Sequence, residues 1–520
     1  MKLSHLLEKV SNKHADITKS QPAKNDPEIT SIHLRAQDVK PGGLFVAIKG
    51  EKTDGHNFID TALEKGAAAI ITQKPVKKNA IVIQVENTRK TLAEISAKFY
   101  GNPSEKLVII GITGTNGKTT TAYLIESILQ QAGINVGVIG TISCRYADTT
   151  FYPAMTTPES IELQRILDKM LKNNITHVVM EVSSHAIDLG RINCCMLDIA
   201  VFTNLTQDHL DYHKNMEAYW QCKKKMFTEH LFASPKINKA AVINCENHKG
   251  KELFNAISDQ KISVGTDKDH TAYLSKISYD LKGIKGIFSI PYGEFDFMSS
   301  LVGKHNAQNL ACATGVGVAL NLHPDTIKAG LENVEYVPGR LEPIDNNFNR
   351  HIYVDYAHTP DALGNILSTL KSMSEKKLIC VFGCGGDRDK TKRSIMGKVA
   401  GTFCDLVIIT SDNPRTEDPL VIIDNVVQGV REVSPKQFAS SNMNNNSQSL
   451  YEQTKGYIIE PDRKTAIQLA LIKSGTGDTI IIAGKGHETY QIFDKKKYAF
   501  DDREEAKKAL QTIFQKTCKN

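Results

Sequence analysis

The stretch GITGTNGKTTT (111–121) constrains the fold more than any other part of the chain. It overlaps the apolar run LVIIGIT (107–113), which is typical of a buried strand, and it leads into TTAYLIESILQQAG (120–133), which has helical periodicity. A strand, a glycine-rich turn and a helix in this order predict a phosphate-binding loop. The glycines let backbone N–H groups surround a phosphate, and the start of the helix is electropositive. Lys118 would neutralise the outer phosphates of a nucleotide, and the Thr119 hydroxyl would reach a Mg²⁺ ion.

The loop departs at one position from the usual pattern G-x-x-x-x-G-K-[ST]. Gly117, Lys118 and Thr119 match this pattern, but Ile112 stands where the first glycine is expected. The alternative interpretation is a glycine turn between strand and helix that binds nothing. Because Gly-Lys-Thr stands directly at the start of the helix, we interpret the stretch as a variant of the nucleotide-binding loop.

The chain has 520 residues, which is too many for one hydrophobic core and predicts two to four domains. Turn signals divide it into three blocks, residues 1–103, 104–336 and 337–520. Strand-like runs alternate with helical segments in the second and third blocks, and this alternation predicts parallel sheets. The fold class is therefore α/β, with a small α/β N-terminal domain, a central P-loop ATPase-type parallel sheet and a C-terminal Rossmann-like domain. We expect the polar tract SSNMNNNSQS (440–449) to be a surface loop.

Composition argues against several classes of protein. The net charge is +6 and the basic residues are scattered, so there is no nucleic-acid footprint. The start of the chain lacks an apolar stretch of signal-peptide length, and no run approaches 18 apolar residues, so we expect no membrane association. The ten cysteines include no CxxC pair, which disfavours a zinc site or a disulfide framework. We expect a cytoplasmic protein with reduced thiols.

Two further strand ends in the second block carry groups that suit a metal bound by phosphates. THVVMEVSS (176–184) brings Glu181 to the carboxyl end of its strand, and the segment after the next strand supplies Asp208 and His209. Carboxyl ends of parallel strands meet at one edge of a sheet, where α/β proteins bind ligands. Taken alone, His209 and His213 are more often packed or surface histidines, and the glutamate of an HExxH zinc motif is absent. Because His209 follows the strand that comes after Glu181, we take it as a candidate metal ligand.

The strand ends of the third block predict a second binding crevice. Arg388, Arg415 and Glu488 each follow a predicted strand, so they would converge at one edge of the sheet. A guanidinium grips a carboxylate with two parallel hydrogen bonds, whereas Asp412, Asn413 and Glu488 could accept bonds from an ammonium. Such a mixture suits a zwitterionic ligand. For Arg415 the alternative is a proline turn, formed by Pro414, whose arginine faces solvent.

Together these segments resemble the Mur ligases, ATP-dependent amide-forming enzymes of bacterial cell-wall precursor synthesis. The resemblance runs in order over nearly the whole chain and is carried by GTNGKTTT (114–121), TTPES (156–160), EVSSHAIDLGR (181–191), TNLTQDHLDYH (203–213), GKHNAQN (303–309), PGR (338–340), DYAHTPDAL (355–363), GCGGDRDKTKR (383–393) and DNPR (412–415).

The resemblance implies roles at positions that match the family motifs. It implies that ATP is bound by Gly114, Thr115, Asn116, Gly117, Lys118, Thr119 and Thr120 in the loop, by Asn306 and Asn309 near the base, and by Arg340 and Asp355 from the C-terminal domain. It implies a Mg²⁺ site at Thr119, Glu181, His209 and Lys223, the last as a carbamate (N6-carboxylysine). Lys118, Lys223, His209 and Glu181 would then be the catalytic residues. Three successive lysines (223–225) otherwise indicate a solvated face, so the role of Lys223 rests on the resemblance alone.

The resemblance also implies the substrates. A UDP-linked substrate would contact Thr156, Thr157, Ser183 and Arg191. The amino-acid acceptor, meso-2,6-diaminopimelate, would contact Arg388, Asp412, Asn413, Pro414, Arg415, Gly484 and Glu488. The N-terminal domain would hold the UDP end, the central domain ATP and the C-terminal domain the amino acid. The family usually carries Asp-Ser-Arg before the P-G-x-L-F segment, but this chain has Arg35-Ala36-Gln37, so Ser31 or His33 is a candidate substitute.

The implied activity is the ATP- and Mg²⁺-dependent addition of meso-diaminopimelate to UDP-N-acetylmuramoyl-L-alanyl-D-glutamate through an acyl phosphate, by a monomer, in peptidoglycan synthesis and hence in cell shape and division. Arg415 favours diaminopimelate because its distal end carries a carboxylate that lysine lacks. One alternative keeps the scaffold but uses another acceptor, such as lysine, or acts like folylpolyglutamate synthetase. The other alternative is a P-loop nucleotide switch, which would hydrolyse ATP without forming an amide.

Overall fold

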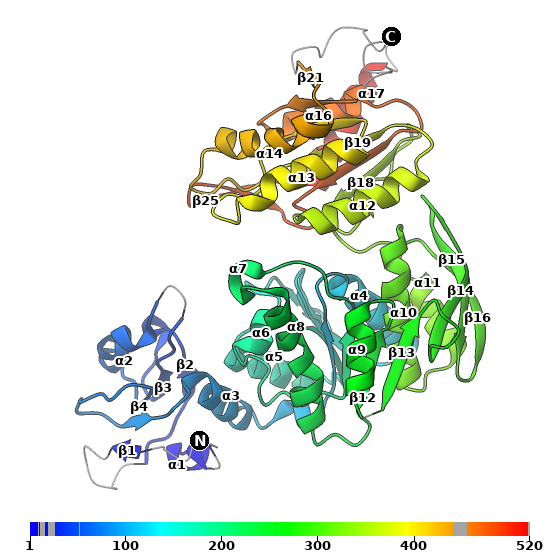
Figure 1. Ribbon diagram of the computed structural model, residues 1–520. Helices are drawn as coiled ribbons and strands as arrows, with labels where there is room; N and C mark the ends of the chain where they lie inside the picture. Colours follow the sequence, from blue (N-terminus) through cyan, green and yellow to red (C-terminus); the bar gives the residue numbers. More distant parts are fainter. Residues whose placement is uncertain are drawn as a thin grey trace.

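The structure is a computed structural model, and it describes residues 1–8, 10, 16–18, 26–50, 53–258, 260–439 and 455–517. The polar tract 440–449 lies outside the described residues. Three separate sheets follow one another along the chain, and the predicted three-domain α/β class is confirmed. In Figure 1 the N-terminal part (blue) lies to one side of the central part, and the C-terminal part (yellow to red) lies above it.

The N-terminal sheet has the strand order β1-β5-β4-β3-β2, in which β2 to β5 run parallel and β1 is antiparallel to β5. The predicted runs LFVAIKG, AAAIIT and IVIQV supply its buried strands. Its elements are α1 (Leu3–Leu7), β1 (Asp16–Thr18), β2 (Ser31–His33), β3 (Gly43–Val46), α2 (Ile59–Glu64), β4 (Ala69–Thr72), β5 (Val82–Gln84) and α3 (Thr88–Phe99).

The central sheet has the order β16-β15-β14-β13-β12-β11-β6-β10-β7-β8-β9, and the strands from β14 to β7 in this order run parallel. Its strands are β6 (Val108–Thr113), β7 (Val136–Ile139), β8 (Cys144–Tyr146), β9 (Thr149–Phe151), β10 (His177–Glu181), β11 (Ile199–Phe202), β12 (Ala240–Asn244), β13 (Lys261–Gly265), β14 (Ala272–Asp280), β15 (Gly283–Ile290) and β16 (Gly293–Ser299). Its helices are α4 (Lys118–Gln131), α5 (Ser160–Lys172), α6 (Ser184–Asp188), α7 (Leu210–His213), α8 (Met216–Lys225), α9 (His248–Ala256), α10 (Lys304–Ala319) and α11 (Pro324–Glu332).

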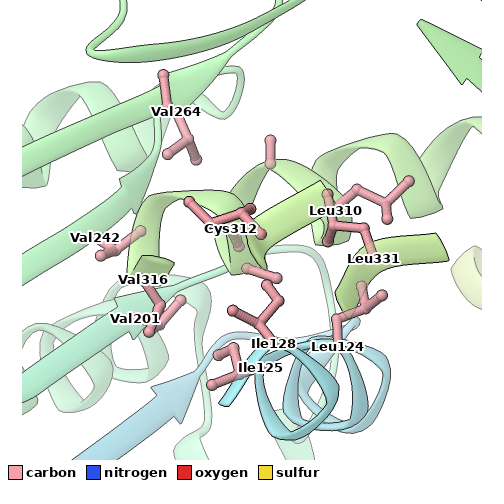
Figure 2. Close-up of a cluster of buried hydrophobic side chains, with 14 of the residues drawn as sticks. Leu124, Ile125, Ile128, Val201, Val242, Val264, Leu310, Cys312, Val316 and Leu331 are labelled. Carbon is pink, nitrogen blue, oxygen red and sulfur yellow. The ribbon is translucent and has the colours of Figure 1, made fainter. Parts of the chain in front are cut away.

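Helices cover both faces of the central sheet, which explains why its parallel strands are apolar throughout. One core joins α4, α10 and α11 to the sheet. Figure 2 shows Ile125 and Ile128 of α4 beside Val201 of β11, with Val316 of α10 next to them. A second core forms on the opposite face under α5, α8 and α9. Strand β6 lies in the middle of the sheet between β10 and β11, so the loop after it is held on both sides.

The C-terminal sheet has the order β17-β18-β23-β19-β20-β22-β21 and is parallel apart from β17. It contains β17 (Glu342–Pro343), β18 (His351–Asp355), α12 (Pro360–Met373), β19 (Leu378–Phe382), α13 (Thr391–Phe403), β20 (Leu406–Ile409), α14 (Pro419–Val433), β21 (Gln437–Phe438), β22 (Gly456–Ile459), α16 (Arg463–Lys473), β23 (Thr479–Ala483) and α17 (Asp502–Thr517). A hairpin of β24 (Tyr490–Phe493) and β25 (Lys496–Ala499) follows β23. Strands β23, β19 and β20 are neighbours, so the loops that follow them lie together.

Contacts between the three parts bear directly on the site. The Arg89 guanidinium in α3 donates to Glu159 of the central part at 3.0 Å. Tyr353 Oη of the C-terminal part donates to the Leu281 carbonyl at 3.0 Å. In the described part of the chain no helix is long and apolar enough to cross a membrane.

Candidate active site

The loop after β6 has the backbone that a phosphate cradle requires. Gly114 and Gly117 have φ of 151° and 87°, and an added Cβ would clash with Thr203 Oγ1 at Gly114 and with Asn309 Oδ1 at Gly117. The neighbouring strand end fixes the loop from outside, because Asn116 N–H donates to Asn204 Oδ1 at 2.9 Å. The N-cap residue of α4 is Gly117, which has no side chain to cap the first turn, so the N–H groups of that turn can face an anion.

Two lysines converge on one carbonyl of this loop. Lys118 Nζ and Lys223 Nζ each donate to the Gly114 carbonyl at 2.8 Å, and Lys118 also donates to the Thr115 carbonyl at 2.9 Å. Burial lowers the pKa of Lys118, and burial together with the nearby Lys118 charge lowers the pKa of Lys223 well below its ordinary value. Lys223 is 1% exposed, so it does not belong to the solvated face that its two following lysines suggest.

Glu181 is placed by the end of β10 next to the loop. Its carboxylate is buried and accepts hydrogen bonds from Thr119 Oγ1 at 3.0 Å, Thr141 N–H at 2.9 Å and Thr141 Oγ1 at 2.9 Å. All of these donors are neutral. No ion pair to Glu181 forms among the described residues, and Lys118 acts on it only through its charge at longer range. A buried carboxylate without an ion-pair partner is costly, and this supports a role as a cation ligand.

His209 is the N-cap residue that precedes α7, and it has a left-handed backbone with φ 54°. Its ring packs edge-on against His185, with 5.0 Å between centroids, and its Nε2 lies 3.4 Å from Asp208 Oδ2. Burial lowers the pKa of His209 to about 4, although Asp208 acts in the opposite direction. The imidazole is therefore neutral at pH 7, which is the form that ligates metals.

These residues fit a hard divalent cation. A threonine hydroxyl, a carboxylate and a neutral imidazole, from Thr119, Glu181 and His209, supply oxygen and nitrogen donors beside the phosphate loop. Lys223 as an amine does not suit Mg²⁺, whereas its carbamate would add two oxygens. Within the described ranges no group of three or more His, Cys, Asp and Glu side chains gathers as a metal site. The predicted Mg²⁺ site would therefore need the Thr119 hydroxyl and phosphate oxygens of the nucleotide as further ligands.

The remaining predicted ATP residues lie around the same loop. Thr115 Oγ1 accepts from Thr206 N–H at 3.0 Å, and Thr120 is buried in the first turn of α4. Asn306 and Asn309 are buried on α10; Asn309 Nδ2 donates to Asn306 Oδ1 at 2.8 Å, and Asn309 lies against Gly117.

The C-terminal part already reaches the loop. Arg340 Nη2 is 3.4 Å from Thr119 Oγ1, and Asp361 Oδ2 is 3.4 Å from Asn116 Nδ2. Asp355 is buried and accepts from the N–H groups of Leu341 and Ala357, each at 2.7 Å, so both of its carboxylate oxygens are occupied by the backbone. Burial raises the pKa of Asp355 to about 6, with Arg340 opposing this shift.

The residues predicted for the UDP-linked substrate form one connected patch beside Glu181. Thr157 Oγ1 donates to the Glu181 carbonyl at 2.9 Å and accepts from Ser183 N–H at 3.1 Å, and Ser183 Oγ caps α6. Thr156 Oγ1 is 3.1 Å from Thr141 Oγ1.

Arg191 joins this patch to the N-terminal part. It donates through Nη1 to the Thr157 carbonyl at 3.2 Å and through Nε to Glu159 Oε1 at 3.0 Å. Glu159 Oε2 in turn accepts from Arg89, so one carboxylate aligns two guanidinium groups from two parts of the chain.

In the N-terminal part, the two residues proposed to replace the serine of the family's Asp-Ser-Arg segment are hydrogen-bonded to each other. Ser31 Oγ and His33 Nε2 lie 2.7 Å apart on β2. Arg35 precedes a short 3₁₀ turn over Ala36–Asp38 and lies 3.6 Å from Asp38.

The predicted arginines of the C-terminal crevice meet at one glycine. A Cβ on Gly385 would lie 3.0 Å from Arg415 Nη1 and 3.9 Å from Arg388 Cγ. Arg415 is half-buried, with a left-handed backbone at φ 53°, and its Nη1 donates to the Gly386 carbonyl at 2.8 Å. Arg415 is therefore held against the loop after β19 rather than extended into solvent, while the Arg388 side chain is exposed.

The acidic side of the crevice lies at the ends of β20 and β23. The buried residues after β20 are Asp412, Asn413 and Pro414. Gly484 follows β23, and a Cβ added to it would lie 4.0 Å from Asp412 Oδ2. Asn413 Nδ2 donates to Glu488 Oε2 at 2.9 Å. Asn413 Oδ1 already accepts from Ile492 N–H at 2.9 Å, which leaves the two carboxylates as the better acceptors for an ammonium.

Sequence reasoning missed several residues that the fold brings into these sites: Thr141, Glu159, Asp361 and Lys485. Glu159 lies within the quoted TTPES, Asp361 within the quoted DYAHTPDAL, and Lys485 between the predicted site residues Gly484 and Glu488, so the signal was their position beside residues chosen for other reasons. Thr141 lies two residues after the end of β7, which neighbours β10, and only the strand order reveals its contact with Glu181.

The fold and its nucleotide loop define an ATP-dependent ligase. Three family models match successive parts of the chain: "Mur ligase family, catalytic domain" at residues 28–100, "Mur ligase middle domain" at 112–317 and "Mur ligase, glutamate ligase domain" at 339–486. The chain is 42% identical over 492 residues to UDP-N-acetylmuramoyl-L-alanyl-D-glutamate–2,6-diaminopimelate ligase of Geobacter metallireducens, covering 94% of this chain and 95% of the relative. It is also 42% identical to the enzyme of the same name from Bacillus cereus, with coverage of 94% and 95%.

Among solved structures, one of a UDP-N-acetylmuramoyl-L-alanyl-D-glutamate–2,6-diaminopimelate ligase matches with a TM-score of 0.66 and 29% identity, covering 95% of this chain and 97% of that one. The folylpolyglutamate synthase of Mycobacterium tuberculosis complexed with ADP shares the fold, with a TM-score of 0.59 at 18% identity over 76% of this chain and 91% of that one. The chain belongs to the Mur ligase family.

Proposed function

We propose that this ligase joins meso-2,6-diaminopimelate to the D-glutamate γ-carboxyl group of UDP-N-acetylmuramoyl-L-alanyl-D-glutamate, with ATP as co-substrate, in peptidoglycan precursor synthesis. The names of the relatives that match nearly the whole chain support this substrate pair. We further propose that the enzyme acts as a monomer in the cytoplasm, where its nucleotide substrates would be available.

The acceptor assignment is carried by the charge pattern of the C-terminal crevice. Arg415 and Arg388 lie beside Gly385, and the carboxylates of Asp412 and Glu488 lie beside Lys485. The distal end of meso-diaminopimelate has both a carboxylate and an ammonium, and each would meet the opposite charge. Lysine would leave the half-buried Arg415 guanidinium without a carboxylate partner, which costs on the order of 2 kcal/mol.

The geometry supports an acyl-phosphate mechanism. While the phosphates lie in the loop between Gly114 and Thr119, an oxygen of the D-glutamate γ-carboxylate bonds to the γ-phosphorus of ATP and the bond from that phosphorus to the β–γ bridging oxygen breaks. The products of this step are the acyl phosphate and ADP. Lys118 would exchange its two loop carbonyls for phosphate oxygens and so neutralise the transferring group. The acceptor amine then attacks the acyl phosphate, the amide forms and phosphate leaves. Catalysis is mainly positioning and charge stabilisation.

Thr119, Glu181 and His209 are the residues that would hold Mg²⁺. The ion, when bound, would offset the repulsion between the substrate carboxylate and the phosphates. Thr141 orients Glu181 by two hydrogen bonds, and Arg340 contacts Thr119 from the C-terminal part. The contact of Arg340 with the loop supports closure of the C-terminal domain over ATP as the step that completes the site.

Lys223 is proposed to carry a carbamate, as N6-carboxylysine. Its amine is buried and directed at a carbonyl that Lys118 also contacts, and in the described part of the chain no carboxylate forms an ion pair with it. In the modification the amine nitrogen bonds the carbon of CO₂ and releases a proton. The resulting anion would convert a repulsive lysine pair into an attractive one.

The proposal is tested by supplying UDP-N-acetylmuramoyl-L-alanyl-D-glutamate, ATP and Mg²⁺ with either meso-diaminopimelate or L-lysine, and by following phosphate and the tripeptide product together. We expect one phosphate per tripeptide and product with diaminopimelate. Equal rates with lysine would contradict the acceptor assignment. Phosphate release without tripeptide would instead favour a nucleotide switch.

A further inference from the structure

Lys485 is a fully buried lysine in the turn after β23, and it lies among the polar groups of the acceptor crevice. Its Nζ is 3.2 Å from Glu488 Oε2, 3.3 Å from Asn413 Oδ1 and 3.6 Å from Asp412 Oδ1, and its side chain is 0% exposed. An ammonium taken completely out of water must be compensated by such partners. A buried lysine at this point is therefore not an incidental packing residue.

Lys485 fixes which atoms of the crevice remain open. Glu488 Oε2 accepts hydrogen bonds from both Lys485 Nζ and Asn413 Nδ2. The other carboxylate oxygen, Oε1, is therefore the one that can accept a bond from a ligand. Asn413 is held with its Oδ1 toward Lys485 and Ile492 N–H, which prevents its amide group from turning over. The lysine thus sets the orientation of both side chains.

One buried carboxylate oxygen next to Lys485 belongs to an ion pair but lacks a hydrogen-bond donor among the described residues. Asp412 is 8% exposed, and its Oδ1 accepts no hydrogen bond in the described part of the chain, because Lys485 is slightly too distant to donate. Buried polar atoms are almost always satisfied, so an unsatisfied carboxylate oxygen in a crevice indicates a ligand donor. Asp412 Oδ1 and Glu488 Oε1 form the pair of acceptors that an ammonium needs.

The charges agree with this arrangement. Asp412 and Glu488 carry two negative charges and Lys485 one positive charge, so this side of the crevice has a net charge of −1. A single distal ammonium then brings the group to neutrality. Without Lys485, two carboxylates in a largely dehydrated site would repel each other, and Glu488 would lose the contact that holds it.

We propose that Lys485 is a specificity-determining positioning residue of the acceptor site: it holds Glu488 and Asn413 so that Asp412 Oδ1 and Glu488 Oε1 receive the distal ammonium of the acceptor. This inference rests on the proposed function, because it takes the crevice to be where the acceptor amino acid binds. Lys485 itself does not touch the reacting atoms, which lie at the nucleotide loop.

The test compares Lys485→Met with Lys497→Met. Lys497 is the matched control because its ammonium lies over the same Tyr490 ring, at 4.2 Å from the centroid against 5.5 Å for Lys485, but it is exposed. We expect Lys485→Met to raise the KM for the acceptor about tenfold or more, as loss of a charge-assisted contact does. The KM values for ATP and for the UDP-linked substrate, and kcat at saturating acceptor, should stay close to wild type. Lys497→Met should change none of these.

Lys485→Arg supplies the rescue, since it keeps the charge in a different shape, and its acceptor KM should fall between wild type and Lys485→Met. If Lys485→Met fails to fold in a thermal unfolding experiment, this second variant decides the matter by the same KM comparison. An unchanged acceptor KM, or an equal rise in all three KM values, would overturn the inference. The KM values are measured with whichever amino acid, diaminopimelate or lysine, the wild-type enzyme uses better. A wild-type preference for lysine would therefore refute the choice of diaminopimelate as acceptor but would leave the test of Lys485 intact. Absence of product with either acceptor would refute the proposed function and this inference with it.

Discussion

The two glycines at the ends of α4 provide a direct test of the phosphate loop. Gly117 precedes the helix with φ 87°, and Gly133 follows it with φ 70°, so both have left-handed backbones. Their surroundings differ completely. A Cβ at Gly117 would clash with Asn309 Oδ1, whereas a Cβ at Gly133 would meet no heavy atom within 4 Å. Gly133→Ala therefore isolates the backbone cost, and Gly117→Ala adds the steric cost.

The expected magnitudes follow from this difference. A left-handed alanine costs about 1–2 kcal/mol in unfolding free energy, and both variants should lose this amount. Displacing Asn309 in a close-packed loop adds about 1–3 kcal/mol for Gly117→Ala alone. Since about 1.4 kcal/mol corresponds to a factor of ten in affinity, a comparable distortion of the cradle should weaken ATP binding by tenfold or more.

Urea unfolding with and without ATP measures both quantities, and steady-state kinetics gives the KM for ATP. We expect Gly133→Ala to be destabilised but to keep wild-type ATP binding, and Gly117→Ala to lose more stability and most of its stabilisation by ATP. Equal destabilisation of the two variants, together with wild-type ATP affinity in Gly117→Ala, would refute the reasoning.

Three further predictions concern the remaining sites. Glu159→Gln should raise the KM for the UDP-linked substrate about tenfold with little change in kcat, because Arg191 and Arg89 lose the carboxylate that aligns them; an unchanged KM in steady-state kinetics would contradict this role. Burial raises the pKa of Asp355 from an unfolded value of about 3.9 to about 6, so the folded state binds this proton more tightly and stability falls as pH rises between these values. Urea unfolding at pH 4 and pH 7 should show that Asp355→Asn loses this decline, and an identical pH dependence in the variant would argue against it. NMR with ¹³C-bicarbonate should show a carbamate signal that is absent in Lys223→Met but present in Lys224→Met, and a signal that survives Lys223→Met would place the modification elsewhere.

The sequence predicted the features that depend on local pattern. The strand and the helix expected around the loop are present as β6 and α4, and Gly114 and Gly117 have the positive φ that a phosphate cradle needs in spite of Ile112. Phosphate binding by this loop stays a prediction. The alternation of strands and helices gave the three-domain α/β class, and the rule that parallel strands end at one edge placed Asp412 near Gly484.

Contacts that depend on strand order or on the third dimension were not predictable from one sequence. Lys223, Lys224 and Lys225 are chemically identical along the chain, and only the position of α8 against the loop buries the first of them. Lys485 follows an apolar strand as any surface lysine could, and its burial results from loops after β20 and β23 that are some 70 residues apart in the chain. The contacts of Glu159 with guanidinium groups from two domains were not predictable for the same reason, because they depend on how the domains lie in space.

The most direct test of the proposed acceptor is the ratio of kcat/KM for meso-diaminopimelate to that for L-lysine, measured for the wild type and for Arg415→Ala. The wild-type ratio should be large, and removal of the guanidinium should reduce it about thirtyfold or more, mainly by lowering the value for diaminopimelate. A wild-type ratio near one, or a large ratio that Arg415→Ala leaves unchanged, would contradict the assignment.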